Sequence, residues 1–267
     1  MPLPDPQAIA PAVLERILAS LDAIEAREDV RILLAVESGS RAWGFPSPDS
    51  DYDVRFIYLH RRDWYLAIEP GRDVIEMPAE DVLDISGWDL KKALQLLIKP
   101  NPVLLEWLDS PIRYREDEAA TAAMKALAVR TRYHVPASYH YRRLGEGQWR
   151  RHIDGRAQVS LKKYFYALRP TLALRWLRLV PGQRPPMDLP GLLAGLDLTA
   201  EVRDCIDALL VRKRVTNELG DGPRMPALDA LIESELQRPD PVVAPTTPTR
   251  QDLVDEANAL FRRLVNA

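Results

Sequence analysis

Cysteine and histidine are scarce in this chain, and their scarcity removes two kinds of site. Cys205 is the only cysteine, so the chain cannot form an internal disulfide, and its apolar neighbours predict a buried structural thiol. His134, His140 and His152 are spaced too widely to form a ligand pair on one helix, and no cysteine accompanies them. We therefore expect no zinc site, and the lone thiol favours a reducing cytoplasm.

Long apolar runs and several well-known motifs are also missing. No segment approaches the roughly 20 apolar residues that span a bilayer, so we expect no membrane partner. Residues 1–6 lack a basic stretch and an apolar run, and we do not expect a signal peptide there. The Gly-x-Ser-x-Gly, Walker A and Gly-x-Gly-x-x-Gly patterns are absent as well, which argues against the enzyme classes that they mark.

The chain has no large net charge, but its charges are distributed unevenly. Its 267 residues include 36 basic and 39 acidic ones, and 46% are hydrophobic, which is enough for a substantial core. Between Arg130 and Arg178, twelve Lys and Arg residues accompany only two acidic residues. This segment predicts a basic surface for a polyanion beside an acidic, metal-binding body. The alternative is that these charges solvate several helix faces.

Hydrophobic periodicity divides the chain into a mixed first half and a helical second half. Strands are expected at 31–37, 51–59, 73–77 and 81–85, and helices at 10–26, 63–68, 86–99, 159–179, 201–219, 227–237 and 250–265. Pro170 is expected to kink or divide its helix. Residues 239–249, rich in Pro and Thr, predict a linker. Strands that alternate with helices indicate one layered sheet.

Two acidic residues in the expected 51–59 strand are the most informative feature. Side chains two positions apart on a strand project from the same face, so Asp51 and Asp53 present neighbouring carboxylates. Carboxylates held this close repel each other unless a cation lies between them or one is protonated. Hard oxygen ligands suit Mg²⁺, which takes substrate phosphates as further ligands. The pair therefore predicts a metal site for an in-line displacement at phosphorus.

A Gly-Ser turn precedes these acids. Gly39 allows the backbone to approach a phosphate closely, Ser40 adds a hydroxyl donor and Arg41 adds a charged one. An ordinary strand-to-helix turn is the alternative. The order of apolar strand, Gly-Ser turn, loop and acidic strand favours phosphate binding.

At these residues the chain resembles a known group of enzymes. Val36-Glu-Ser-Gly-Ser with Asp51-Tyr-Asp-Val resembles the signature of the DNA polymerase beta superfamily of nucleotidyltransferases. Longer stretches resemble one branch, the predicted nucleotidyltransferases of bacteria and phages, some of which are linked to RNA-repair operons. These stretches are Gly39-Ser-Arg-Ala-Trp-Gly-Phe, Pro48-Asp-Ser-Asp-Tyr-Asp-Val, Gly87-Trp-Asp-Leu-Lys-Lys-Ala-Leu, Leu105-Glu-Trp-Leu-Asp-Ser-Pro-Ile and Lys162-Lys-Tyr-Phe-Tyr-Ala-Leu-Arg-Pro. The region after Pro181 matches nothing in the family pattern.

The resemblance implies a third carboxylate on a later strand of the same sheet. We expect it to be Asp84, which lies between apolar residues, and to help activate the attacking hydroxyl as a base or metal ligand. Asp89 and Glu76 are the alternatives. Asp89 also fits a helix capping box begun by Ser86, and Glu76 also fits surface charge on an edge strand.

A basic face of the expected 159–179 helix is the last candidate. Lys162, Tyr166 and Arg169 follow one another at spacings of four and three, apart from the apolar stripe. Such a face suits a triphosphate or an incoming strand, with Tyr166 stacked on a base. The alternative is a solvated face over a buried stripe, and the family resemblance favours nucleotide binding.

The resemblance implies an α+β fold. We expect a small mixed β-sheet, palm-like catalytic domain with helices on one face over residues 1–113, followed by an all-α domain over residues 114–267. The implied reaction is Mg²⁺-dependent transfer of an NMP from an NTP, ATP before the others, to an acceptor hydroxyl, with Mn²⁺ as the alternative metal. An RNA end is the expected acceptor. Transfer of AMP to a protein hydroxyl and a non-catalytic nucleic-acid-binding module are the alternative functions.

Overall fold

The division of the chain into two units organises the fold. The computed structural model describes residues 9–69, 71–78, 81–216, 219–239 and 249–267. Within these ranges, one unit holds the residues up to Ala42, those from Asp51 to Arg132 and the C-terminal segment. The other unit holds residues 43–50 and the residues from Tyr133 onward that precede the C-terminal segment. The chain therefore leaves the first unit after Ala42 and returns to it at Asp51.

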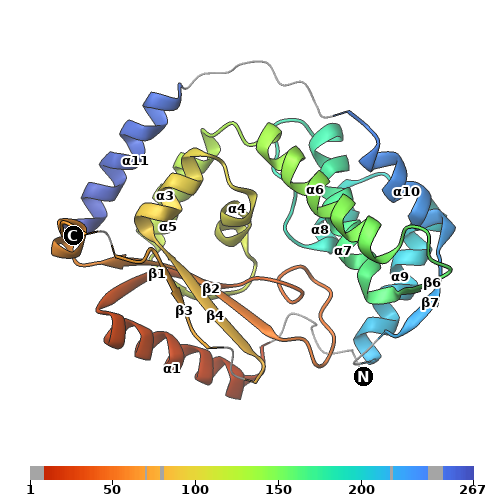
Figure 1. Ribbon diagram of the computed structural model, residues 1–267, viewed down its shortest axis with the longest axis horizontal. Helices are drawn as coiled ribbons and strands as arrows, with labels where there is room; N and C mark the ends of the chain where they lie inside the picture. The colour runs from red at the N-terminus through yellow and green to blue at the C-terminus, as the bar shows by residue number, and fades with distance from the viewer. Residues whose placement is uncertain (1–8, 70, 79–80, 217–218, 240–248) are drawn as a thin grey trace. The chain divides into compact units, whose positions relative to one another are not determined.

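A five-stranded mixed sheet forms the centre of the first unit (Figure 1). Its strands are β1 (Val30–Glu37), β2 (Tyr52–His60), β3 (Val74–Glu76), β4 (Leu83–Asp89) and β5 (Arg113–Glu116), in the spatial order β3-β4-β2-β1-β5. β2 and β4 are parallel, whereas the other neighbouring strands are antiparallel. The mixed sheet confirms the predicted α+β class.

The sheet carries helices on both faces, whereas helices on only one face were predicted. The burial of β2 on both sides explains the difference. The residues of β2 on one face, from Tyr52 to Tyr58, are buried against α1 (Pro11–Glu28). On the other face, Ile57 and Leu59 are also buried, and α3 (Leu90–Ile98) contacts β2. Figure 1 shows α1 and α3 on opposite sides of the sheet. The second half of β2 is apolar on both sides and is covered on both, while its first half leaves Asp53 and Arg55 partly exposed.

The remaining helices of the first unit extend it beyond the predicted boundary at residue 113. They are α2 (Arg62–Tyr65), α4 (Pro102–Asp109), α5 (Glu118–Val129) and α11 (Arg250–Val265). β5 pairs with β1, and α5 contacts β1 and α4, which keeps the chain in this unit up to Arg132. Most of the predicted linker at 239–249 lies outside the described residues.

α11 returns the end of the chain to the first unit. It begins at Arg250, as predicted, because Thr249 and Asp252 form a capping box. Its buried residues recur with helical periodicity and include Leu253, Ala257, Leu260 and Leu264. α11 contacts α3 and α5, so one amphipathic stripe holds this helix against the sheet unit.

The second unit is mainly helical. Its helices are α6 (His134–His152), α7 (Leu161–Leu179), α8 (Leu189–Gly195), α9 (Ala200–Val215) and α10 (Pro226–Leu236). β6 (Gln158–Ser160) and β7 (Asp221–Pro223) pair as a two-stranded sheet, where an all-α half was predicted. Strands of three residues are too short for alternation to reveal them. α7 continues as one helix across Pro170, so Pro170 does not divide it, which was one of the two expected effects of this proline.

The 43–50 segment is anchored in the second unit. The ring of Phe45 stacks on that of Phe165, with centroids 4.9 Å apart. The Leu189 backbone N–H donates to the Trp43 carbonyl oxygen (2.8 Å), and the Arg169 guanidinium lies 4.6 Å from the centre of the Trp43 ring. The stretch between the Gly-Ser turn and the acids is therefore held by helices that follow much later in the sequence.

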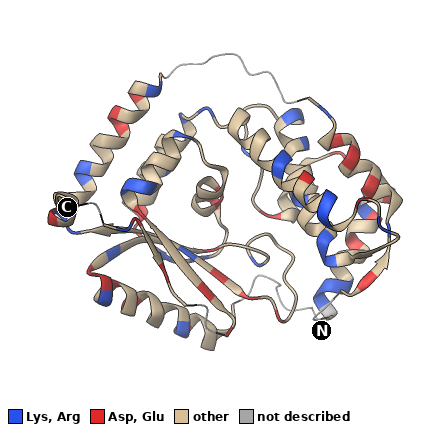
Figure 2. Cartoon of the chain, viewed as in Figure 1, with Lys and Arg blue, Asp and Glu red and all other residues tan. Residues whose placement is uncertain are grey.

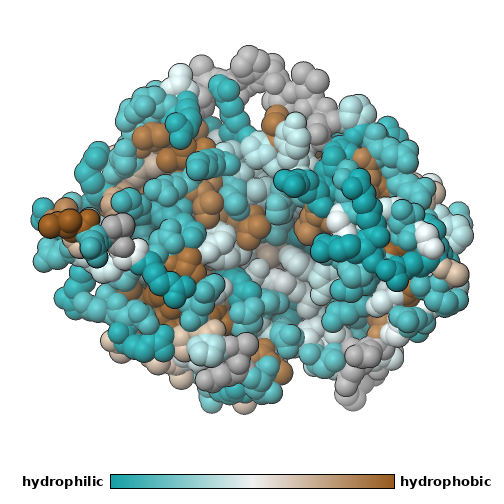
Figure 3. All heavy atoms as spheres, in the orientation of Figure 1, coloured by the Kyte–Doolittle hydropathy of each residue, from teal (hydrophilic) through white to brown (hydrophobic). Residues whose placement is uncertain are grey.

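The surface mixes polar and apolar side chains. Ile68, Val129 and Val211 are among the large hydrophobic side chains that are exposed. In the view of Figure 3, hydrophobic residues form separate patches among hydrophilic ones. Within the described part of the chain, no helix combines the length and the apolar character that crossing a bilayer requires.

Candidate active site

The parallel register of β2 and β4 places two predicted acids side by side. Asp53 lies opposite Asp84, and neighbours in register on adjacent strands project from the same face. Arg55 lies on that face too, with its Nη2 2.7 Å from Asp84 Oδ2 and 3.4 Å from Asp53 Oδ1. The two carboxylates are thus close enough to share one cationic nitrogen.

Arg55 is fixed by the strands themselves. Its Nη1 donates to the carbonyl oxygens of Asp84 (2.8 Å) and Val54 (3.1 Å). The side chain of Arg55 is 18% exposed, whereas that of Asp84 is 51% exposed. Asp84 therefore keeps a face open to solvent while the guanidinium balances part of its charge.

The acids still carry excess negative charge. Burial raises the pKa of Asp53, the Arg55 guanidinium opposes this rise, and the charges of Asp84 and Asp51 add to it. Asp51 lies just before β2 and is exposed. A further cation at this cluster would lower the pKa of Asp53 and stabilise its charged form.

The Gly-Ser turn packs directly on Asp53. Gly39 has φ +93°, and a Cβ at this position would lie 2.0 Å from Asp53 Oδ2. The Ser38 backbone N–H donates to the Asp53 carbonyl oxygen (2.8 Å). Only glycine combines this backbone conformation with so close an approach, so the turn and the acid are built as one structure.

Arg41, the charged residue of the turn, is engaged within the unit. Its guanidinium stacks 3.9 Å from the centre of the Tyr52 ring, and its Nε donates to the Asp51 carbonyl oxygen (3.3 Å). Arg41 is buried, whereas Ser40 is partly exposed. In this arrangement Arg41 ties the turn to the start of β2.

Glu37 is a site residue for which the sequence analysis predicted no role. It is fully buried, and its Oε1 accepts a hydrogen bond from the Asp53 backbone N–H (2.9 Å). The Tyr114 hydroxyl donates to Glu37 Oε2. Burial raises the pKa of Glu37 to about 7. The available signal was an acidic residue that ends an apolar strand directly before the Gly-Ser turn.

The two alternative third carboxylates are engaged elsewhere. Asp89 caps α3, where its Oδ1 accepts from the Lys91 N–H (2.7 Å) and its Oδ2 from the Tyr65 hydroxyl (2.6 Å). Glu76 pairs with Arg72 at the surface. The predicted capping box begun by Ser86 does not form, because β4 continues through Ser86 to Asp89 with alternating burial. Of the three candidates, the structure brings Asp84 next to Asp53.

The acidic cluster fits a divalent cation by its chemistry. Among the described residues, no group of three His, Cys, Asp or Glu side chains is already arranged as a metal site. Asp53 and Asp84 nevertheless supply hard oxygens around the Arg55 nitrogen, which marks a place where positive charge is held between them. Asp51 adds to the negative charge at Asp53.

The three predicted nucleotide contacts of α7 belong to the second unit and differ in exposure. Lys162 is exposed, Tyr166 is half-buried and Arg169 is 4% exposed. Arg169 Nε donates to the Met187 carbonyl oxygen (2.8 Å) beneath the Trp43 ring. The three side chains do not form one solvated face, because the 43–50 segment covers the end of the predicted row. Sequence periodicity within α7 carries no information about that cover.

The basic side chains between Arg130 and Arg178 also differ in exposure and in partners. Figure 2 shows basic positions recurring along α6, and Arg143 and Arg151 on this helix are exposed. Arg175 and Arg178, by contrast, pair with the buried Glu235 at 2.8 and 2.6 Å. Part of the charge is therefore available to a polyanion, and part stabilises the helical unit.

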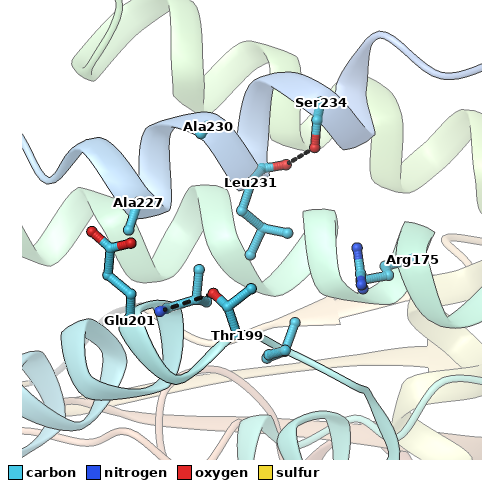
Figure 4. A pocket seen from close by; sticks show the side chains of 9 residues that line it. Arg175, Thr199, Glu201, Ala227, Ala230, Leu231 and Ser234 are labelled. Atoms are coloured by element: carbon cyan, nitrogen blue, oxygen red, sulfur yellow. Dashed lines mark hydrogen bonds between the residues drawn. The ribbon is translucent and has the colours of Figure 1, made fainter.

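A cavity of about 300 Å³ lies in the second unit (Figure 4). Residues of α7, α9 and α10 line it, among them Arg175, Glu201 and Leu231. Its two hydroxyl groups are engaged, Thr199 Oγ1 by the Val202 N–H and Ser234 Oγ by the Leu231 carbonyl. None of the predicted site residues lines this cavity.

Comparisons with known proteins identify the family of the chain. Residues 13–263 match the model of a family described as RlaP, the RNA repair pathway DNA polymerase beta family. The chain is 44% identical over 253 residues to Uncharacterized protein YcgL of Bacillus subtilis (strain 168). The aligned region covers 94% of this chain and 96% of that protein. A crystal structure of a nucleotidyltransferase-like protein from Exiguobacterium sibiricum 255-15 is a weak match. Its TM-score is 0.28 at 12% identity, over 92% of this chain and 75% of that chain.

Proposed function

Because the chain belongs to the RNA repair pathway DNA polymerase beta family, we propose that it is a nucleotidyltransferase that moves an NMP from an NTP to an acceptor hydroxyl. The observation that carries this proposal is the register of β2 and β4, which aligns Asp53 with Asp84 beside the Gly39 turn. Acids on one face of a sheet next to a phosphate-binding turn are what metal-dependent transfer at phosphorus requires.

The acids are assigned to the metal and to the attacking hydroxyl. Asp51, Asp53 and Asp84 would hold Mg²⁺, with Mn²⁺ as the alternative. When bound, such a cation neutralises phosphate charge and polarises the reacting oxygens. Asp84, whose side chain is more exposed than that of Asp53, would take the proton of the acceptor hydroxyl. The acceptor oxygen then bonds to the α-phosphorus, the bond to the leaving phosphate oxygen breaks, and pyrophosphate departs.

The turn is assigned to the rest of the triphosphate. The backbone at Gly39 and the Ser40 hydroxyl donate to the β- and γ-phosphates, while Arg41 holds the turn against Tyr52. In the second unit, Lys162 is assigned to phosphate and Tyr166 to the base. Arg169 braces Trp43, so its contribution to nucleotide binding acts through that ring.

RNA is the proposed acceptor, and ATP the proposed nucleotide. The family description places its members in RNA repair, and exposed arginines on α6 supply charge for an RNA backbone. The proposal includes a cytoplasmic location, which a chain with one cysteine fits.

The destination of an α-phosphate label tests this function. The full chain is incubated with Mg²⁺ and α-labelled ATP, with either RNA bearing a free 3′-hydroxyl or bacterial lysate as the acceptor. We expect label on RNA, accompanied by pyrophosphate, and none with Asp53→Asn. Label on protein alone would instead establish a protein adenylyltransferase. RNA binding without any transfer would establish a non-catalytic module.

A further inference from the structure

Lys213 carries a buried charge that the proposed function does not use. It lies in the last turn of α9, and its side chain is 2% exposed. Among the described residues, its Nζ has no hydrogen-bond partner. An ammonium group has three donors, and removing them from water without acceptors is unfavourable. Burial accordingly lowers the pKa of Lys213 to about 8, so the group remains mostly protonated at neutral pH.

Two aromatic rings satisfy this ammonium only in part. Its Nζ lies 4.8 Å from the centre of the Phe45 ring and 5.5 Å from that of Phe165. The C-terminal end of α9 adds a favourable dipole. A ring face and a helix dipole attract a cation, but neither accepts the hydrogen bonds that the ammonium lost on burial.

The charges around Lys213 also favour the binding of an anion. Lys162, on the first turn of α7, lowers the pKa of Lys213, and Asp49 opposes this effect less strongly. Lys163 follows, with its Nζ 5.4 Å from the centre of the Tyr166 ring. The N-cap of this helix, Ser160, makes no side-chain capping bond. Two lysines therefore begin a 19-residue helix whose N-terminal dipole favours negative charge.

We propose that Lys213 and Lys162 form a phosphate-binding site at the N-terminus of α7. The phosphate belongs to the nucleoside triphosphate or to RNA, and it supplies the acceptors that the Lys213 ammonium lacks. The flexible four-carbon stem lets Nζ leave the two phenyl rings for the anion while α9 stays in place. This inference rests on the proposed function and extends it to Lys213, which lies beyond the stretches that resemble the family.

Binding of inorganic tripolyphosphate without divalent cations tests the site. Calorimetry compares the full-length protein with Lys213→Met, Lys162→Met and Lys99→Met, the last being the same charge change at an exposed position of the other unit. We expect the first two substitutions to weaken binding about tenfold, since each removes a charge-assisted hydrogen bond, and Lys99→Met to change it less than twofold. Lys162 is exposed, so its variant keeps the test valid if Lys213→Met does not fold.

A second titration with a short 5′-phosphorylated RNA identifies the source of the phosphate. Weaker binding of tripolyphosphate alone assigns the site to the nucleotide, and weaker binding of RNA alone assigns it to the acceptor. The proposal is overturned if Lys162→Met and every folded Lys213 variant bind both probes as tightly as the unmodified protein. A lower melting temperature of Lys213→Met with unchanged affinities would identify the lysine as a structural anchor and would also overturn it.

The outcome is separable from that of the proposed function. Asp53→Asn leaves both lysines in place, so it should bind metal-free tripolyphosphate normally while losing transfer. If Asp53→Asn retains transfer, the proposed function fails and the phosphate site stands. If transfer depends on Asp53 but tripolyphosphate binding is independent of both lysines, the phosphate site and the assignment of Lys162 to phosphate fail, while the proposed transfer reaction stands.

Discussion

The sheet unit and the helical unit hold their charged groups in different ways. In the sheet unit, Asp53 and Asp84 are neighbours because two parallel strands run in register, and Arg55 on the same face balances them. In the helical unit, Arg169 and Lys213 lie under rings of the 43–50 segment, which is distant from them in sequence. Strand geometry thus positions the acids locally, whereas tertiary packing positions the cations.

The largest effect is expected when one of the two neighbouring acids is removed from the sheet. Asp53→Asn should lower kcat for nucleotide transfer about 1,000-fold or more, because a neutral amide no longer holds a divalent cation beside Asp84. Initial rates of α-label incorporation measure the effect. Glu76→Gln is the matched control, since Glu76 pairs with Arg72 at the surface, and it should retain the normal rate. Equal losses in both variants would contradict the assignment.

A second test asks whether the sheet unit favours the protonated form of the buried Glu37 carboxyl group. The pKa of Glu37 is raised from 4.5 to about 7, so its contribution to stability is fully present below pH 4.5 and is lost as the pH rises through 7. In a chelating buffer, the free energy of unfolding should fall by about 3 kcal/mol across this range. Glu37→Gln should lack this component in urea titrations at pH 5 and pH 8. An identical pH dependence in both proteins would show that Glu37 does not titrate in this way.

A third substitution disturbs the contact between the turn and the acid. Gly39→Ala introduces a Cβ that would lie 2.0 Å from Asp53 Oδ2, at φ +93°. We expect transfer to fall about 100-fold, because a displacement near 1 Å in a reacting site has an effect of that order. Gly155→Ala is the control. That residue also has a positive φ, +68°, but no atom lies within 4 Å of its added Cβ. If both variants transfer at the same rate, the close approach is unimportant.

The smallest effect is expected in the helical unit, where charge supports stability. Glu235→Ala leaves Arg175 and Arg178 without their shared carboxylate and should lower the free energy of unfolding by about 2 kcal/mol. Denaturant titration measures the loss. Glu233→Ala, a change at an exposed acid of the same helix, should change stability by less than about 0.5 kcal/mol. A comparable loss in the two variants would remove the special role of Glu235.

The sequence predicted the sheet unit better than the helical unit, for a physical reason. The alternation in β2 and the capping box of α11 are local patterns, and both elements lie close to where they were predicted. The first half of β4 was predicted as a strand, but its second half, from Ser86 to Asp89, was mistaken for the start of a helix because these two residues also fit a local cap. Pairing with β2 and β3 overrides that preference.

The buried cations show what local patterns leave out. The spacing of Lys162, Tyr166 and Arg169 predicted one face, yet Trp43 covers Arg169. Cys205, predicted to be buried, is half-buried on α9. The exposure of each of these side chains depends on which distant segment packs above it, and helical periodicity does not contain that information. The division of the chain at Arg132 depends in the same way on strand pairing and helix packing.

A crystal structure of the full chain with Mg²⁺ and a non-hydrolysable nucleoside triphosphate tests the central claim most directly. The proposed function predicts metal bound to Asp51, Asp53 and Asp84, with the phosphates against Gly39 and Ser40. Asp89 and Glu76 should keep their present partners. Saturating Mg²⁺ and nucleotide with no metal at Asp51 or Asp53 would contradict the assignment of this face as the site of nucleotide transfer.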